Sequence, residues 1–243
     1  MSIHHTSGAP FLLDPAKLAF PDPRRALREP NGLLAIGGDL SPQRLLAAYR
    51  LGIFPWYGRN EPILWWSPDP RCVLFPDLLH ISRSLQKTLR RNTFELSIDR
   101  AFPEVMKACA APRRYTAETW ITSEVYTAYN RLHQLGHAHS VEARHNGELV
   151  GGLYGVALGK VFYGESMFAR ITDASKVAMA HLCQRLQQWG YELIDCQMHT
   201  THLVSLGAVD IPRADFMALL NSLLPQQPAA DAWQSNPQSA AAP

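Results

Sequence analysis

The stretch that most constrains the fold lies between residues 139 and 168 and reads HSVEARHNGELVGGLYGVALGKVFYGESMF. It consists of three apolar-rich segments separated by two turn signals. Asn146-Gly147 is a strong hairpin signal because both residues tolerate positive φ, and Gly159-Lys160 is a weaker one. The stretch therefore predicts three antiparallel strands, each joined to the next by a tight turn.

A helix and a further strand are predicted after this meander. Asp173 can cap a long helix that ends before Gly190 and carries an apolar stripe along one face. The next segment, YELIDCQM at residues 191–198, has strand character. A meander followed by a helix and another strand predicts a mixed α/β (α+β) sheet, of the kind that acyltransferases often use. Periodicity predicts three more elements: a strand at residues 94–99, a helix at 122–135 and a final helix at 212–224.

Changes of composition divide the chain. Residues 1–31 carry five prolines with little periodicity, which is typical of an extended arm. A short helix is predicted between Ser41, which can cap it, and Gly52, which can end it. A segment rich in proline and aromatic residues favours a boundary near residue 62, and the composition from Pro225 onward favours disorder. We therefore expect a small N-terminal domain with an extended arm at residues 1–62, a larger domain at 63–224 and a disordered tail at 225–243.

Composition excludes several classes of protein. A chain of 243 residues can bury an ample core, and 47% hydrophobic with 18% charged residues is the balance of a folded globular protein. The sequence has no signal-peptide pattern and no run near the ~18 apolar residues of a membrane span, so we expect a cytoplasmic protein without membrane contact. The four cysteines form no C-x-x-C pair, which favours reduced thiols. A formal net charge of +2 predicts no nucleic-acid partner by itself.

The segment ISRSLQKTLRR at residues 81–91 has an unusual charge pattern. With helical periodicity its large apolar residues share one side and its cations share the other, and it contains no carboxylate. An ordinary solvated helix face usually mixes both signs, so a phosphate-binding face is the alternative to a plain surface helix. The cations are Arg83, Lys87, Arg90 and Arg91.

Two carboxylates, Glu165 and Asp195, stand inside predicted apolar strands, where acids are rare without a partner. Side chains alternate along a strand, so Asp195 and Gln197 are predicted to share one face, and such a pair can position an amine and a proton. The alternative is that each acid binds an arginine in a structural role. Cys196 is predicted to face the other way without a histidine to activate it, which disfavours a nucleophilic cysteine.

Two further patterns are too weak to predict a cofactor. The segment from Gly155 to Val161 is similar to a phosphate-binding loop, but it is one residue short and ends in valine instead of a hydroxyl residue. Cys196, His199 and His202 have the spacing of metal ligands, yet a structural zinc site needs four ligands. We therefore expect neither a metal nor another cofactor.

Five groups of sequence motifs occur in order between about residue 10 and residue 224: NGLLAIGGDLSPQRLLAAYRLGIFPWY, ILWWSPDPRCVLFP, AYNRLHQLGHAHSVE, GELVGGLYGVALGKVFYGESMF, and LIDCQ with SLGA. Together they resemble the bacterial leucyl/phenylalanyl-tRNA-protein transferases. The resemblance implies a small N-terminal domain joined to a larger acetyltransferase-like (GNAT-like) domain. It also implies an enzyme that moves Leu or Phe, and less readily Met, from aminoacyl-tRNA to the N-terminal Arg or Lys of a protein. The product would then enter the N-end route of protein degradation.

The resemblance implies roles for individual residues. Asp195 and Gln197 match a pair that organises the attacking amine, and Glu165 matches an acid that helps to hold the aminoacyl end or the cationic acceptor. Aromatic positions around the aminoacyl-adenosine are matched by Trp56, Trp120 and Tyr129. The donor side chain is implied to lie among Leu153, Met179, Leu182, Leu186 and Ile194. The acceptor arm of the tRNA is implied to contact Arg83, Lys87, Arg90 and Arg91.

Two other functions stay open as alternatives. An acyl-CoA-dependent N-acetyltransferase would share the architecture, but the segment ARITDASKV lacks the glycines on which that class binds pyrophosphate. A non-catalytic aminoacyl-tRNA-binding protein would keep the basic helix and the aromatic positions. The resemblance favours the transferase, without a cofactor, and we expect it to be a monomer.

Overall fold

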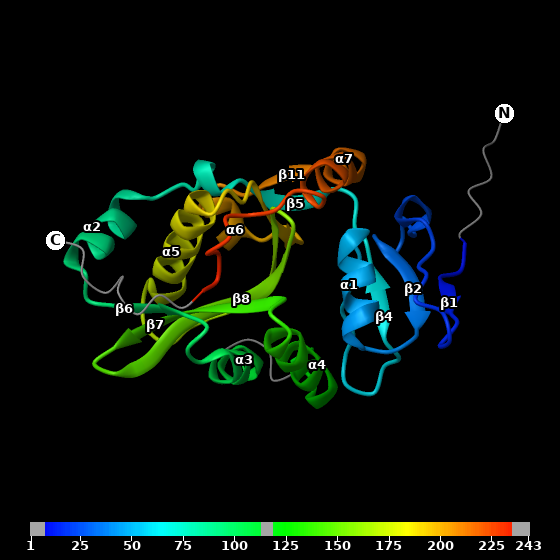
Figure 1. Ribbon diagram of the computed structural model, residues 1–243, viewed down its shortest axis with the longest axis horizontal. Coiled ribbons are helices and arrows are strands. Elements are labelled where there is room, and N and C mark those ends of the chain that lie inside the picture. Colours follow the sequence, from blue (N-terminus) through cyan, green and yellow to red (C-terminus); the bar gives the residue numbers. More distant parts are fainter. Residues whose placement is uncertain (1–7, 113–118, 235–243) are drawn as a thin grey trace.

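The computed structural model describes residues 8–112 and 119–234. Within these residues the chain forms two β-sheets, a small one near the N-terminus and a larger one with helices on both faces (Figure 1). The mixed α/β class predicted from the sequence is confirmed. None of the helices in the described ranges is long and apolar enough to cross a membrane.

The small sheet has the strand order β1-β2-β4-β3, with β1 and β2 parallel and the other neighbours antiparallel. Helix α1 (Pro42–Arg50) begins as predicted, since the Ser41 hydroxyl accepts a hydrogen bond from the Arg44 N–H and Pro42 occupies the first turn. The remaining elements of this part are β1 (Phe11–Leu13), η1 (Pro23–Arg25), β2 (Leu33–Gly37), β3 (Phe54–Pro55) and β4 (Leu64–Trp66).

The larger sheet has the strand order β11-β5-β10-β9-β8-β7-β6. The predicted meander is confirmed: β7, β8 and β9 pair antiparallel in sequence order. Helix α5 then carries the chain back across the sheet, so that β10 pairs parallel to β9, as a crossover connection requires. The strands are β5 (Arg71–Leu74), β6 (Glu95–Ile98), β7 (Ala138–His145), β8 (Glu148–Leu158), β9 (Val161–Ala169), β10 (Leu193–Gln197) and β11 (Val209–Ile211).

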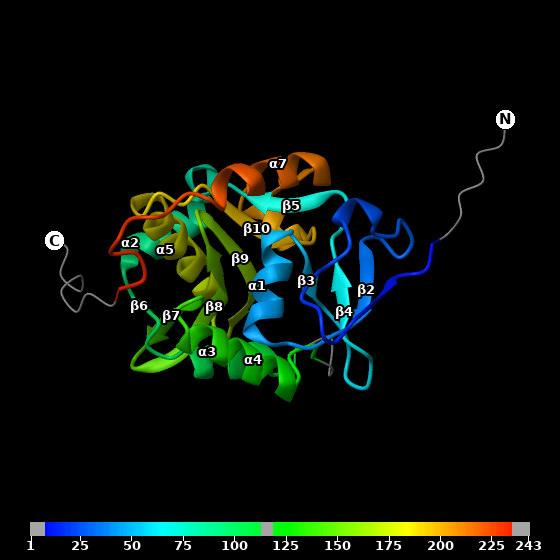
Figure 2. The ribbon, with the colours of Figure 1, turned by 45° about the vertical axis from the view of Figure 1, so that its right-hand side comes forward.

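Helices cover both faces of the larger sheet (Figures 1 and 2). On one face α5 packs against β7, β8 and β9, and α2 packs against α5. On the other face α3 packs against β7 and β8, α4 packs against β7, and α4 also contacts α1. The helical elements are η2 (Pro76–Leu78), α2 (Arg83–Arg91), α3 (Phe102–Ala110), α4 (Ser123–Gln134), α5 (Ala174–Gln188), α6 (Thr201–Ser205) and α7 (Arg213–Leu223).

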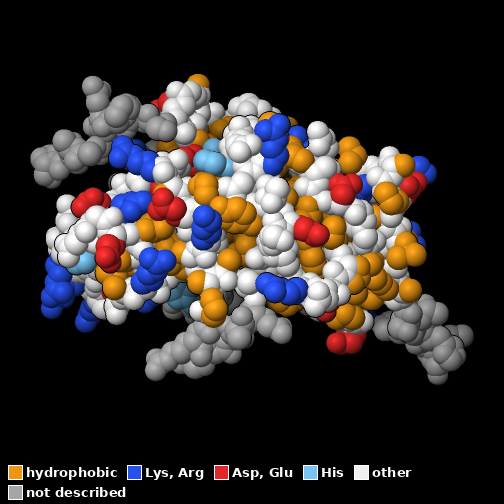
Figure 3. All heavy atoms as spheres, turned by 90° about the horizontal axis from the view of Figure 1, so that it is seen from below, with side chains coloured by type: hydrophobic (Ala, Val, Ile, Leu, Met, Phe, Trp, Pro, Cys, Tyr) orange, Lys and Arg blue, Asp and Glu red, His pale blue; other side chains and the backbone are white. Residues whose placement is uncertain are grey.

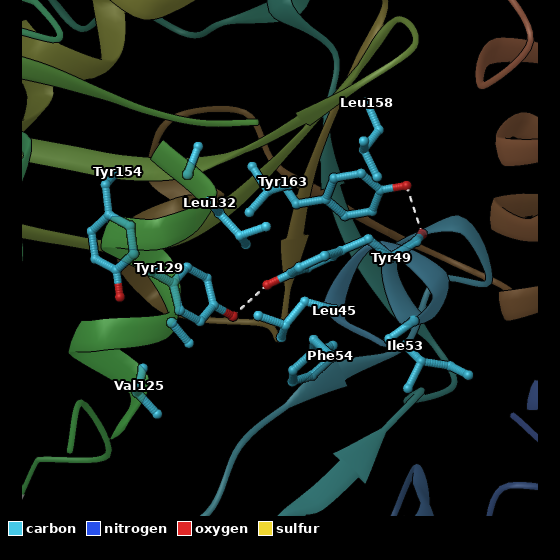
Figure 4. Packing of buried hydrophobic residues seen from close by; sticks show 14 of the residues in the cluster. Leu45, Tyr49, Ile53, Phe54, Val125, Tyr129, Leu132, Tyr154, Leu158 and Tyr163 are labelled. Carbon is cyan, nitrogen blue, oxygen red and sulfur yellow. Dashed lines mark hydrogen bonds between the residues drawn. The ribbon is translucent and has the colours of Figure 1, made fainter. Parts of the chain in front are cut away.

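The two sheets share a hydrophobic core. Leu45 and Tyr49 of α1 belong to the same buried cluster as Tyr129 of α4 and Tyr163 of β9, and Figure 4 shows these side chains packed together. The close approach of α1 and α7 requires a glycine: a Cβ on Gly52 would lie 2.6 Å from the Phe216 ring, and its φ is +66°. The small N-terminal part is therefore packed onto the larger sheet.

Two of the expected boundaries differ from the structure. The small sheet extends past residue 62, because β4 at Leu64–Trp66 pairs with both β2 and β3. The tail expected to be disordered from Pro225 is packed on the larger sheet as far as residue 234, where the Trp233 ring stacks on His139 and its Nε1 donates a hydrogen bond to the Tyr191 hydroxyl at 2.7 Å. Residues 235–243 lie outside the described residues.

Candidate active site

A cavity of about 930 Å³ opens where the carboxyl end of β10 meets the middle of β9. The small sheet closes one side with Phe54, Pro55 and Trp56, and the wall continues through α3, β8, β9 and α5 to the start of α6. Most of its lining is apolar, and Glu165 and Gln197 are polar groups within it. A cavity of this size and lining is typical of a site for an organic ligand.

Glu165 lies at the centre of a hydrogen-bond cluster drawn from four elements. Its Oε1 accepts from the Tyr49 hydroxyl at 2.7 Å and from Gln197 Nε2 at 2.9 Å, and its Oε2 lies 3.2 Å from the Tyr129 hydroxyl. Burial raises the pKa of Glu165 from 4.5 to about 7, with a further contribution from the nearby Asp195 charge, although the hydrogen bonds oppose this shift. Glu165 therefore titrates near neutral pH.

Gln197 reaches Glu165 because the strand is irregular. Asp195 pairs with Tyr163 in the parallel register of β10 and β9, so position 197 lies opposite position 165. On the other side of β10 the register with β5 shifts between Asp195 and Gln197, and Gln197 has a φ of +64°. A bulge of this kind redirects a side chain at the edge of a site. The Gln197 backbone N–H donates a hydrogen bond to Asp195 Oδ1 at 2.9 Å, which stabilises the bulge.

Asp195 is fully buried and turned away from the cavity. Its Oδ1 accepts from Arg71 Nε at 2.8 Å and its Oδ2 from Arg71 Nη2 at 2.6 Å, a two-pronged ion pair in which both side chains are buried. The Arg71 guanidinium also lies 4.8 Å from the Phe54 ring centroid and 4.6 Å from that of Phe216. The prediction that Asp195 and Gln197 share one face is therefore corrected: Asp195 faces Arg71, as the structural alternative had it, and the bulge turns Gln197 toward Glu165.

Five of the residues predicted to bind substrate do line the cavity. Trp56, which is 41% exposed, lies on the small sheet, and Trp120 precedes α4. The other lining residues of this set come from three elements of the larger domain: Leu153 of β8, Met179 of α5 and Ile194 of β10.

Three predicted substrate-binding residues lie behind the cavity wall. Tyr129 is fully buried and holds Glu165 and Tyr49 instead of facing a ligand. Leu182 and Leu186 are fully buried farther along α5, in the core between that helix and the sheet. Both lie on the same face of α5 as Met179, but only the first turns of α5 reach the cavity.

The four cations of α2 are exposed on the side of the helix away from the buried Leu85. Helix α2 is fixed to the start of α5 by a hydrogen bond of 2.9 Å from the Thr88 hydroxyl to Asp173 Oδ2. The sequence predicts that the Asp173 side chain caps α5. Asp173 does occupy the position before the helix, but its side chain makes no capping hydrogen bond. Figure 3 shows Lys and Arg side chains gathered at the left-hand end of the face it displays, the end at which Figure 1 draws α2.

Cys196, His199 and His202, which have the spacing of metal ligands, do not form a metal site in the described residues. His199 Nδ1 lies 2.9 Å from Asp210 Oδ2, and His202 lines the cavity. Within residues 8–112 and 119–234, no group of three or more His, Cys, Asp and Glu side chains is arranged to hold a metal ion.

Comparison with known sequences assigns the chain to a family. The profile described as leucyl/phenylalanyl-tRNA protein transferase matches residues 73–221, and the profile for the N-terminal domain of the same family matches residues 38–69. The chain belongs to this family. A leucyl/phenylalanyl-tRNA-protein transferase of Nitrosomonas europaea is 63% identical over 204 residues, which cover 84% of this chain and 86% of the relative. One of Stutzerimonas stutzeri is 59% identical over 218 residues, which cover 90% and 96%.

Two solved structures that this leucyl/phenylalanyl-tRNA-protein transferase family member resembles are much more distant than these relatives. L-PGS from Bacillus licheniformis has a TM-score of 0.37 at 13% identity and covers 69% of this chain and 54% of its own. A GCN5-related N-acetyltransferase from Kribbella flavida has a TM-score of 0.36 at 14% identity and covers 70% and 60%. Likeness at this level says nothing about the activity of the chain.

Two residues of the site were missed from the sequence. Tyr49 lies in a short helix where the sequence offers no sign of a polar role, and only its tertiary position shows that its hydroxyl reaches Glu165. Arg71 follows a proline-rich segment with no periodicity, and only the pairing of β5 with β10 brings it to Asp195. A buried acid in a strand is a signal that some cation must be near, but it does not say which one.

Proposed function

We propose that this chain transfers leucine or phenylalanine, and less readily methionine, from aminoacyl-tRNA to the N-terminal Arg or Lys of an acceptor protein. The observation that carries the proposal is the hydrogen bond between Gln197 and Glu165 at the wall of a large apolar cavity. Relatives of nearly full length carry the name of that activity. We further propose that the enzyme acts in the cytoplasm as a monomer.

The main task of the enzyme in this reaction is to position the two substrates. The aminoacyl ester of tRNA is already activated, so the neutral amine of the acceptor attacks the ester carbon, a C–N bond forms and the C–O bond to the ribose breaks. The proton that the amine loses is transferred to the ribose oxygen, which leaves as a hydroxyl group of the tRNA. Holding amine and ester in contact supplies most of the acceleration such a step needs. No enzyme nucleophile is required.

Gln197 is placed to orient the amine. Its Nε2 donates to Glu165, which leaves the Oε1 carbonyl oxygen to accept a hydrogen bond from an amine in the cavity. Asp195 acts from behind, because its contacts with the Gln197 N–H and with Arg71 hold the bulge. In this proposal Gln197 and Glu165 contact the substrates, and Asp195 is a positioning residue.

The apolar wall suits the donor amino acid. Leu153, Met179 and Ile194 are the side chains we propose to contact the leucine or phenylalanine, and Trp56 and Trp120 those that stack on the terminal adenosine. A hydrophobic pocket separates residues that differ by one methylene by only ~1–3 kcal/mol, which fits the tolerance of Leu, Phe and Met. The cations of α2 would contact phosphates of the acceptor arm and carry no base readout.

A transfer assay tests the proposal. The protein is incubated with Leu-tRNA and a peptide that begins with Arg, and the peptide is weighed by mass spectrometry; we expect it to gain one leucine. Phe-tRNA and Met-tRNA serve as further donors, and the same peptide with an acetylated N-terminus is the matched control. Tight tRNA binding without a mass gain would indicate a binding protein, and transfer of an acetyl group from acetyl-CoA would indicate an acetyltransferase.

A further inference from the structure

Three oxygen-bearing side chains meet at the back of the cavity. The Tyr49 and Tyr129 hydroxyls lie 2.5 Å apart, Tyr49 Oη lies 2.7 Å from Glu165 Oε1, and Tyr129 Oη lies 3.2 Å from Glu165 Oε2. Figure 4 shows the two phenols pointing toward each other, one from α1 and the other from α4. The three contacts form a closed triangle.

Counting protons distinguishes the two charge states of this triangle. Burial holds the pKa of Tyr49 and of Tyr129 well above 10, so each phenol keeps one proton. If Glu165 is a carboxylate, the triangle has two protons for three contacts. One pair of oxygens must then face each other at hydrogen-bond distance with no proton between them, which is unfavourable in a buried site.

A protonated Glu165 supplies the missing proton. Its carboxyl O–H donates to Tyr129, the Tyr129 O–H donates to Tyr49, and the Tyr49 O–H donates back to the other carboxyl oxygen. Each side chain then donates once and accepts once, and Gln197 Nε2 still donates to Oε1. We propose that Tyr49, Tyr129 and Glu165 form a closed ring of hydrogen bonds that keeps Glu165 a neutral carboxylic acid when the cavity is empty.

The groups around the ring agree with a neutral acid. The charge of Asp195 of β10 disfavours a second negative charge on Glu165, while Arg71 is engaged by Asp195 through two hydrogen bonds. Tyr163 of β9 directs its hydroxyl to the Tyr49 carbonyl, and Tyr154 of β8 packs its ring edge-on against Tyr129. No described Lys or Arg side chain makes an ion pair with Glu165.

Tyr49 is the positioning residue that this ring adds to the site. It comes from α1 of the small N-terminal part, so the docking of that part on the larger sheet sets the protonation of Glu165. Its meaning for the reaction rests on the proposed function: the empty cavity offers the donor ester a neutral wall, and a cationic acceptor beside Glu165 would favour release of the proton.

An infrared titration of the full-length protein without substrates tests the ring. The carbonyl stretching band of a protonated carboxyl group is followed from pH 5 to pH 9, and the part that Glu165→Gln removes is assigned to Glu165. If the tyrosines merely donate hydrogen bonds to a carboxylate, Tyr49→Phe must raise the midpoint of this band. The ring predicts the opposite, a fall of about one pH unit, because the variant removes the contact that the charged state cannot satisfy.

Tyr129→Phe also removes the contact between the two phenol hydroxyls and is expected to lower the midpoint too. The test therefore does not depend on one variant. Tyr163→Phe is the matched control. It removes another buried phenol hydroxyl next to Tyr49, outside the ring, and the Tyr49 carbonyl keeps its hydrogen bond of 3.0 Å from the Gly52 N–H, so the midpoint should stay in place. A rise in both ring variants, or a Glu165 without a protonated band at pH 6, would overturn the proposal. Because no tRNA is present, this result is independent of the transfer assay.

Discussion

Asp195 and Gln197 stand two residues apart in one strand and have different tasks. Alternation predicted a shared face, and the prediction failed because one residue with positive φ, Gln197, ends the regular pleat. No sequence pattern marks such a bulge, since glutamine rarely adopts that conformation and the hydrogen bond from its N–H to Asp195 stabilises it only in the folded chain. Glu165 and Asp195, the two acids predicted to need partners inside apolar strands, both have them in the fold: Glu165 accepts from Tyr49 and Gln197, and Asp195 binds Arg71.

Removing the Asp195 charge should lower the free energy of unfolding more than removing the charge of an exposed ion pair. Asp195→Asn leaves the buried Arg71 without its partner, and we expect a loss of about 3 kcal/mol in the free energy of unfolding, measured by urea denaturation. Asp210→Asn is the matched control, because Asp210 pairs with the exposed His199, and it should cost less than about 1 kcal/mol. Equal losses in the two variants would contradict the structural role of Asp195.

Glu165 should make stability depend on pH. Its folded pKa of about 7 exceeds the ordinary value of 4.5, so the folded chain keeps a proton that the unfolded chain loses between these values. The contribution is complete below pH 4.5 and disappears as the pH rises through 7. Between pH 4.5 and 8, the wild-type protein should lose on the order of 3 kcal/mol of unfolding free energy relative to Glu165→Gln. Two parallel curves of stability against pH would show that Glu165 is ionised throughout.

The segment 81–91 forms the helix α2 that its pattern predicts, with Ser82 as the N-terminal cap and the cations exposed. Arg83→Gln with Lys87→Gln should weaken binding of Leu-tRNA and Phe-tRNA by the same factor and reduce the slope of log affinity against log salt by about 1 to 2. Arg131→Gln, an exposed cation of α4, is the control and should leave both unchanged. A loss confined to one donor would contradict a role in phosphate contacts.

The C-terminal segment shows where composition misleads. Proline, glutamine and alanine dominate it, but the single aromatic residue Trp233 is enough to anchor residues 225–234 against Trp189 and Tyr191. Trp233→Ala should lower the free energy of unfolding by about 2 kcal/mol, because a large, partly buried ring is lost. Thermal unfolding measures this, with the exposed Gln227→Ala as the control. An unchanged melting temperature for Trp233→Ala would indicate that the segment contributes nothing to stability.

Over the whole molecule, periodicity predicts most of the longer elements and the short strand β6, whereas helix α3 and several short strands are not predicted from the sequence. The meander, α4, α5 and α7 follow from periodicity, whereas β3, β5 and β11 have two to four residues each and exist only because a neighbouring strand pairs with them. The same holds for the site: the apolar wall was predicted in part, and the contacts across the two sheets were not.

Because one hydrophobic cluster spans both sheets, the two parts should unfold together. We expect a single calorimetric transition whose van't Hoff enthalpy equals the measured enthalpy. Gly52→Ala, which forces α1 away from the Phe216 ring, should lower the melting temperature of the whole transition without splitting it. Two separate transitions in the wild-type protein would show that the N-terminal part folds alone.

In the proposed function, Gln197, held by Glu165 at the cavity wall, orients the acceptor amine. The most direct test is the rate of leucine transfer in a single turnover, with enzyme in excess over Leu-tRNA and a saturating Arg-starting peptide, for the wild type and Gln197→Ala. We expect a rate at least about 100-fold lower in the variant, with tRNA affinity within about threefold of the wild type. A variant that transfers leucine at the wild-type rate would contradict it.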